Sequence, residues 1–554
     1  MTGRQENAME AHEKLESDPT IPVMVGVTGH CAVREADGPA LRAAVRAELL
    51  KLKEMCPHSR LVMLNSLARG GDLLCADVAE SLGIPLVVIL PRERADYEQD
   101  FEGDEMDRAR FSHHCQRAEQ VLIAPPVEEV KDGCQMTRDM QYRQAGLYVA
   151  VHSHVLLALW DGVAAQTEDA CGTAGVVAAV MQGCYRPVSG AALRSEGNQA
   201  VIHIFTPRDD GAAQEAGTVR LLGKREALLD VLLKTDEFNQ SVQALPAEEA
   251  PSSRPLQEEA SDPLVYRMQA VGRAADALSG RYALKYRRIL VMLAIASALL
   301  TFAFLMYDEA EAIWMILICG LMLLCAWKCQ RVAARTDCHR RYIEYRALAE
   351  GLRVQSNLRY AGSRIQTADL LSWTQREETA WVMTSLCAMT VGEDPEKRHD
   401  ILHCWVEDQQ DYHRRASVRG TKKLITSERT LRVALVISVA LYLAAVAFEL
   451  VFGGLSLFPA LRLDQAEVYR TVLKIVLGTI SVGTLFVANY YGKLSLSRTV
   501  SDHQKMERFY SQMASQIRMH GQTEALLRTL AREELIENGN WVSYQRDNTP
   551  DMNV

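Results

Sequence analysis

The sequence predicts a protein in two parts: a Rossmann-like α/β domain with a doubly wound parallel sheet, and an all-α membrane bundle with four transmembrane helices. In the first part, residues 23–208, short β-branched apolar runs alternate with segments of helical spacing, which is typical of βαβ units. In the second part, four apolar runs are long enough, or nearly so, to cross a bilayer. These runs are residues 289–307, 313–327, 433–452 and 472–491.

The expected strands are continuous apolar runs, as buried parallel strands require. They cover residues 21–27, 61–64, 85–90, 121–124, 155–160 and 200–205. Helical spacing follows three of them, over residues 40–53, 73–82 and 172–181. Pro39 stands just before the first of these helices, where a helix start tolerates proline.

Composition narrows the class of protein. The chain has 554 residues and a formal net charge of −9, so no global basic field indicates a nucleic-acid partner. None of its 13 cysteines forms a CxxC pair, which favours reduced packing residues over a disulfide framework. The first twenty residues lack the basic and apolar regions of a signal peptide, so the run at 289–307 is expected to direct membrane insertion.

Small and polar residues follow the predicted strands at their carboxyl ends, where such a sheet binds its ligand. Backbone N–H groups beside small residues approach a phosphate closely, and a helix N-terminus adds a favourable dipole. The segments concerned are 28–30, 66–72, 160–162 and 172–173. Simpler interpretations exist for four of these residues: Gly70 and Gly71 as a turn, Asp72 as a helix N-cap, and His30 as a loop histidine with satisfied hydrogen bonds.

Four motifs carry a resemblance to a known family: VTGH at 27–30, SLARGGDLLCADVAESLGIPLVVILP at 66–91, LLALWDG at 156–162 and CGTAGVV at 171–177. Together they resemble the SLOG superfamily, which includes LOG nucleotide phosphoribohydrolases, DprA-type proteins and predicted nucleotide sensors of bacterial conflict systems. The resemblance covers residues 21–210. It implies a nucleotide-derived ligand with no further cofactor, and a pocket lined by Gly26, Thr28, Gly29, His30, Ser66, Ala68, Gly71, Asp72, Asp161, Gly172 and Thr173.

The chain departs from the LOG pattern at one position. LOG enzymes carry a GTxxE loop whose glutamate serves catalysis, whereas Gly172 and Thr173 are followed here by Val176 at the glutamate position. We therefore expect ligand binding without catalysis. The alternative is a membrane-anchored nucleotide-processing enzyme of the LOG type.

The sequence SHHC at 112–115 has metal-binding residue types. Neighbouring histidines on one helix are expected to point to different faces, and no second ligand cluster is evident in the sequence. We therefore predict no metal site and interpret these as exposed helix residues.

The predicted domain boundaries follow composition. Residues 1–20 are expected to be a disordered N-terminus, 21–240 the SLOG-like domain, 241–262 an acidic linker and 263–554 the membrane domain. The stretch from 236 to 262 is rich in Glu, Ala, Pro and Ser, which is typical of a disordered linker. A helix is expected to begin near Pro263 and to continue into the first span.

Charges around the spans predict their orientation. The first hairpin tip, residues 308–311, has no Lys or Arg, whereas basic residues flank the spans at both bases. The positive-inside rule then places both termini on the cytoplasmic side of the membrane, and the resemblance to the SLOG superfamily implies that this is a bacterial inner membrane. The bias is weaker for the second hairpin, because its outer side contains Arg462, Arg470 and Lys474.

Few polar residues lie inside the spans. Glu449, near the outer end of the third span, is either functional or an interfacial residue. Ser481, Thr484 and Asn489 are candidates for a pore face on the fourth span, although close helix packing is the favoured interpretation of small and polar residues there.

The segments 342–353, 405–412 and 532–541 are similar to the SLATT family of membrane effectors, which occur with SLOG domains and nucleotide-synthesising enzymes. Both resemblances together imply an antiviral membrane effector. A nucleotide-derived second messenger would open a homo-oligomeric ion channel in the lipid bilayer. A transporter is the less favoured alternative, because broken helices at the midplane are not evident.

Overall fold

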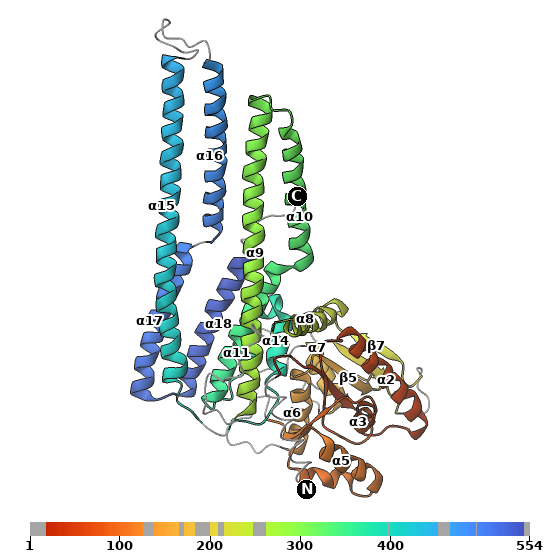
Figure 1. Cartoon of the computed structure of the whole chain (residues 1–554). Helices are drawn as coiled ribbons and strands as arrows, with labels where there is room; N and C mark the ends of the chain where they lie inside the picture. Colours follow the sequence, from red (N-terminus) through yellow and green to blue (C-terminus); the bar gives the residue numbers. More distant parts are fainter. Residues whose placement is uncertain are drawn as a thin grey trace. The chain divides into compact units, whose positions relative to one another are not determined.

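The computed structural model describes residues 18–125, 137–165, 171–182, 200–208, 215–246, 262–395, 398–452, 466–494 and 496–547. They form two compact units, each assembled from segments far apart in sequence (Figure 1). Unit 1 comprises the described residues of Met1–Leu278, Glu344–Asp400 and Gln522–Asn540. Unit 2 comprises those of Ser279–Ile343, Ile401–Gly521 and Trp541–Val554. The expected disordered N-terminus lies almost entirely outside the described residues.

A seven-stranded sheet forms the centre of unit 1, in the order β4-β3-β2-β1-β5-β6-β7. All neighbouring strands are parallel except β6 and β7, so the predicted mostly parallel sheet is confirmed. The strands are β1 (Val23–Gly29), β2 (Leu61–Asn65), β3 (Leu86–Leu90), β4 (Gln120–Ile123), β5 (Val155–Trp160), β6 (Val201–Phe205) and β7 (Val219–Leu222). The sequence did not indicate β7, because this short edge strand is largely exposed and has no continuous apolar run.

Helices cover both faces of this sheet. Alternate residues of a strand point to opposite faces, so Val23, Val25 and Val27 share one core with α2, α3 and α5, whereas Met24 joins a second core with α6 and α7. The helices of this region are α2 (Gly38–Met55), α3 (Gly71–Ser81), α4 (Arg94–Tyr97), α5 (Glu105–Arg117), α6 (Arg138–Val151), α7 (Thr173–Gln182) and α8 (Arg225–Gln243).

Helix α8 corrects the predicted linker. Residues 236–243 are helical, and Asp236 accepts hydrogen bonds from the backbone of His58 and the hydroxyl of Ser59, both at 2.8 Å. Asn239 donates to the carbonyl of Ile21 at 2.7 Å. The polar composition of this stretch hid apolar residues at helical spacing, of which Phe238 is fully buried. The remainder of the expected linker, 247–261, lies outside the described residues.

Helices from the C-terminal half complete unit 1. Phe238 of α8 packs edge-on against Tyr345 at 5.3 Å between ring centroids, and Tyr345 packs against Trp381 at 6.1 Å. The Trp381 indole N–H donates to the buried carboxylate of Glu344 at 2.9 Å. The helices involved are α11 (Cys338–Tyr360), α12 (Thr367–Leu370), α13 (Trp373–Glu378), α14 (Ala380–Ala388) and α18 (Glu524–Asp547). Both halves of the chain therefore contribute packed side chains to unit 1.

This shared core predicts the behaviour of a truncated protein. A chain ending at residue 246 would expose Phe238 and the rest of the apolar face of α8, because Tyr345 and Trp381 would be missing. We expect the fragment 18–246 alone to aggregate or to unfold at a lower temperature than the same fragment co-expressed with residues 344–400. Size-exclusion chromatography and thermal unfolding of both samples measure this. Equal stability of the two samples would contradict the shared core.

Unit 2 contains the candidate membrane spans. Four helices are long and apolar enough to cross a membrane, and at most 17% of the residues in their apolar windows are buried. They are α9 (Pro263–Glu309), α10 (Met315–Thr336), α15 (Asp408–Val451) and α16 (Ala466–Leu494). The four predicted runs are thus confirmed as apolar helices, and α9 confirms that the helix beginning at Pro263 continues into the first run. A π-helix (Leu402–Glu407) precedes α15, and α17 (Leu496–His520) packs along α15 (Figure 1).

Candidate functional site

The order of the strands reverses at β1, which lies between β2 and β5. At the carboxyl end of β1 the backbone passes very close to the start of α3. A Cβ atom on Gly29 would lie 2.9 Å from the Cα of Gly71 and 3.2 Å from Oδ1 of Asp72. The backbone N–H of Gly71 donates to the carbonyl of His30 at 2.9 Å. The structure therefore brings Gly29, His30, Gly71 and Asp72 together, as the sequence predicted.

The loop between β2 and α3 is held in an unusual conformation. Asn65 accepts from the backbone N–H of Leu67 at 2.6 Å and donates to the carbonyl of Asp72 at 2.9 Å. Leu67 has a φ of 54° although its side chain is fully buried, and bulky residues rarely adopt this region. Gly70 has a φ of 75°, and a Cβ there would lie 2.5 Å from the carbonyl oxygens of both His30 and Cys31. Such strain is typical of ligand-binding segments.

Asp72 has the most unusual environment of the predicted site residues. Its side chain is buried, its Oδ2 accepts from the backbone N–H of Ala68 at 3.4 Å, and its Oδ1 has no hydrogen-bond partner within the described residues. Burial raises the pKa of Asp72 to about 7, against smaller lowering effects of the nearby backbone N–H groups of Ala68 and Gly29. The N-cap interpretation is wrong, because Gly70 occupies the N-cap position of α3 and Asp72 lies inside the helix.

His30 joins the ends of β1, β5 and β6. Its Nδ1 lies 2.7 Å from the Arg208 guanidinium, and its Nε2 lies 3.3 Å from Oδ1 of Asp161. Burial and the charge of Arg208 lower the pKa of His30 more than Asp161 raises it, so the ring is neutral at pH 7. Because a guanidinium only donates, Nδ1 accepts from Arg208, and the backbone N–H of Asp161 donates to Nε2 at 3.1 Å. This histidine connects a cation to an anion at the edge of the sheet.

Asp161 completes this group of charges. Its Oδ2 lies 3.3 Å from Nε of Arg208, and its Oδ1 accepts from the backbone N–H of Val163 at 3.0 Å. Burial alone would raise the pKa of Asp161, but the Val163 hydrogen bond and the nearby His30 and Arg208 outweigh it and hold the pKa below its ordinary value. Asp161 is therefore an ionised acceptor that a ribose hydroxyl or an incoming cation can approach.

The other predicted positions take different places. Thr28 is buried in β1 and pairs with Ala158 of β5. Gly26 lies in the middle of β1, where a Cβ would lie 2.4 Å from the Ser153 hydroxyl, so its small size serves packing against the segment that follows α6. Ser66 and Ala68 are half-buried in the loop after β2, Gly172 is exposed, and Thr173 is buried at the start of α7.

Val176 stands where the LOG pattern has its catalytic glutamate. Its side chain is buried in the second core of the sheet, and its Cγ2 lies 2.5 Å from where a Cβ on Gly146 of α6 would stand. A carboxylate at this position would be desolvated among apolar side chains, which is costly unless it is paired. The position serves helix packing in this chain.

Sequence reasoning missed two residues of the site. Arg208 lies just beyond the carboxyl end of β6 and supplies the cation, and its side chain is 58% exposed. The sequence signal that could have indicated Arg208 was its position as a basic residue directly after a predicted strand. Gly70 was interpreted as part of a turn, whereas its conformation and its contact with two carbonyl groups make it the position where the loop is tied to residues 30–31.

The pore candidates on α16 are separate from this site. Thr484 donates to the carbonyl of Ile480 in its own helix at 2.8 Å, and Ser481 is exposed. The side chain of Asn489 lies outside the described residues. Close packing is evident at Gly478, where a Cβ would lie 2.7 Å from Leu305 of α9. Glu449 forms an ion pair with Arg470, with atom distances of 2.5 and 3.0 Å.

No family model, curated protein or solved structure was found to match this chain.

Proposed function

We propose that unit 1 contains a doubly wound, Rossmann-like SLOG-type domain that senses a nucleotide-derived messenger. We further propose that it controls a SLATT-like membrane bundle. In this proposal the protein is a homo-oligomeric antiviral effector in the bacterial inner membrane, with both termini in the cytoplasm. The observation that carries the proposal is the meeting of Arg208, His30 and Asp161 at the carboxyl ends of β1, β5 and β6.

This arrangement suits a phosphorylated ligand. The Arg208 guanidinium is a strong donor for phosphate oxygens, and it is already held at the edge of the sheet by His30 and Asp161. Asp161 can accept from a ribose hydroxyl, as acidic residues at this edge of nucleotide-binding sheets do. A ligand with a phosphate and a ribose hydroxyl would separate Arg208 from Asp161 and would itself contact both residues. Binding would therefore rearrange the strand ends without disturbing the buried sheet.

A continuous helix connects the sensor part to the first span. Helix α9 begins in unit 1 at Pro263 and continues without a break to Glu309 in unit 2. In this proposal α9, which belongs to both units, carries the signal from the sensor to the apolar run. A switch from 1:99 to 99:1 requires roughly 5.5 kcal/mol of differential affinity for the two states, which the pockets of an oligomer would share.

The second candidate function is nucleotide hydrolysis, and Asp72 favours it. A carboxyl group with a pKa of about 7 is suited to general acid–base catalysis at neutral pH. The first function predicts that the ligand is released unchanged. Hydrolysis predicts that it is consumed, and that Asp72→Asn abolishes consumption.

Reconstitution of the full chain in dye-loaded liposomes tests the sensor function. A panel of nucleotides, including ADP-ribose and cyclic dinucleotides, is added, and dye release and the recovered ligand are measured. We expect one compound to cause release, and we expect Arg208→Ala to weaken the response at least about tenfold, since a charged hydrogen bond contributes about 1.5–3 kcal/mol. Arg46→Ala, which removes an exposed arginine on α2, is the matched control.

Two outcomes would contradict the proposal. The first is an Arg208→Ala variant that responds like the wild type, which would place the ligand elsewhere. The second is liposomes that stay sealed while the ligand is converted to product, which would favour the enzyme.

A further inference from the structure

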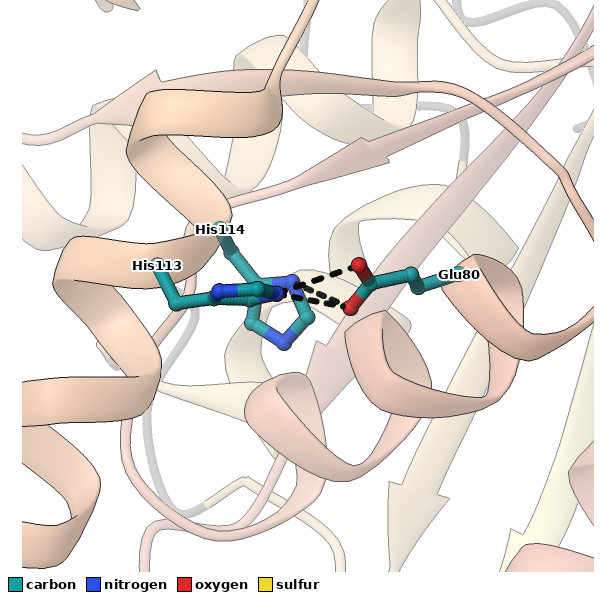
Figure 2. A group of neighbouring side chains, drawn as sticks. All are labelled: Glu80, His113 and His114. Atoms are coloured by element: carbon teal, nitrogen blue, oxygen red, sulfur yellow. Dashed lines mark hydrogen bonds and ion pairs between the residues drawn. The ribbon is translucent and has the colours of Figure 1, made fainter.

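Four ionisable side chains meet between α3 and α5, away from the site described above. His113 Nε2 lies 3.1 Å from both carboxylate oxygens of Glu80, and His114 Nδ1 lies 3.7 Å from Oε2 of Glu80 (Figure 2). Asp77, one turn before Glu80, lies 2.9 Å from Nε2 of His114. The expectation that the two histidines point to different faces is wrong, because their side chains reach the same carboxylate from adjacent positions on the helix.

His114 shows that this group is more than a surface ion pair. Its side chain is only 2% exposed, and its Nδ1 has no hydrogen-bond partner within the described residues. Nε2–H donates to Asp77, so a neutral ring directs the lone pair of Nδ1 toward Oε2 of Glu80. Two acceptors facing each other at 3.7 Å repel, unless a proton or a metal cation lies between them.

We infer that Glu80, His113 and His114 bind a divalent transition-metal ion of the Zn²⁺ class. Their donor atoms all lie within 4.8 Å of one another. Tetrahedral zinc with bonds of about 2.0–2.2 Å keeps its ligands roughly 3.2–3.6 Å apart, and the distances from Glu80 to His113 and His114, 3.1 and 3.7 Å, lie close to this range. Two imidazoles and one carboxylate are a donor set that zinc accepts, with the fourth position left for water.

Asp77 has the position of a supporting group in this site. Metal-bound histidines usually donate their other ring N–H to a carboxylate, which fixes the ring and its tautomer. The 2.9 Å contact between Asp77 and His114 is of this kind, and Arg110 holds Asp77 in turn at 2.6 Å. Because the ligands come from α3 and α5, the ion would clamp these two helices together.

An ion-pair network without metal is the competing explanation. Arg117 lies 2.9 Å from Oε1 of Glu80, and a doubly protonated His114 would bridge Asp77 and Glu80. Arg117 is 65% exposed, so its side chain can leave for solvent when a cation arrives. The two explanations differ in whether the protein binds metal at these residues, which can be measured directly.

The test uses the full chain, purified in detergent without a histidine tag and stripped with a chelator. Co²⁺ is titrated as a spectroscopic substitute for Zn²⁺, and its visible d–d bands report a tetrahedral N/O site. We expect these bands in the wild type, their loss on Zn²⁺ addition, and their absence in Glu80→Gln and His113→Gln. Asp77→Ala should weaken Co²⁺ affinity roughly 10- to 100-fold.

His520→Gln is the matched control, because it removes an exposed histidine on α17 and should leave the bands unchanged. Glu80 and His113 are partly exposed, so their variants should keep the thermal unfolding temperature of metal-free wild type. Bands that persist in Glu80→Gln and His113→Gln would overturn the inference, as would intense thiolate charge-transfer absorption from cysteine ligands. A wild type that binds no Co²⁺ would establish the ion-pair network instead.

Discussion

Replacing Gly70 with alanine should destabilise the protein by roughly 2–6 kcal/mol. Gly70 has a φ of 75° and a ψ of −111°, a combination that strongly favours glycine. The backbone strain contributes about 1–3 kcal/mol. The added methyl group would also stand 2.5 Å from the carbonyl oxygens of His30 and Cys31, and such overpacking costs about 1–3 kcal/mol more. Thermal unfolding of the full chain in detergent measures the loss.

Gly83→Ala provides the matched control. Gly83 has a positive φ of 65° but no atom within 4 Å of an added Cβ, so only the left-handed conformation opposes the substitution, at about 1–2 kcal/mol. Gly70→Ala should therefore unfold at a clearly lower temperature than Gly83→Ala. If the two variants unfold together, the contact between Gly70 and residues 30–31 does not constrain the loop.

Replacing Asp72 with asparagine should stabilise the folded protein at alkaline pH. Burial raises the pKa of Asp72 from 3.8 to about 7, so above pH 7 the folded state contains a buried charge. That shift corresponds to about 4 kcal/mol. Asparagine keeps an oxygen for the N–H group of Ala68, and it removes the charge.

The pH dependence has a definite sign. Between pH 4 and 7 the folded state binds a proton at Asp72 that the unfolded state has lost, so stability falls as the pH rises through this window. The advantage of Asp72→Asn should thus be small at pH 4, grow up to pH 7 and remain constant above it. Thermal unfolding of variant and wild type at several pH values measures this difference. Asp96→Asn, at an exposed position on α4, should show no such trend, and an equal trend in both variants would refute the buried charge.

The sheet was predictable because its strands are buried on both faces. A strand covered by helices on both sides has no polar alternation, and continuous runs such as 86–90 are recognisable without knowledge of their neighbours. Strand β7 and helix α8 cannot be recognised without knowledge of their neighbours. The apolar side chain of Phe238 has its partners more than a hundred residues later, in Tyr345 and Trp381. Local composition therefore indicated a linker where tertiary packing makes a helix.

The candidate site was predictable to a similar degree. Parallel strands bring their carboxyl ends to one edge, which is why His30, Asp72 and Asp161 could be selected from separate motifs. Gly26 came only from the resemblance to the SLOG superfamily, and it packs in the middle of β1. Helical periodicity could not predict that His113 and His114 converge. Their convergence depends on side-chain rotamers and on a carboxylate from another helix.

Unit 1 is assembled from segments far apart in sequence, and this has a consequence for biosynthesis. Its sheet and α8 are complete by residue 246, but its last helical segment ends at Asn540. At about 5–20 residues per second, translation of the intervening chain takes roughly 15–60 seconds. During the first part of this time, until Tyr345 and Trp381 have been translated, the surface around Phe238 has no partner. The nascent chain thus needs protection of this surface, and slowing translation beyond residue 246 should increase its dependence on chaperones.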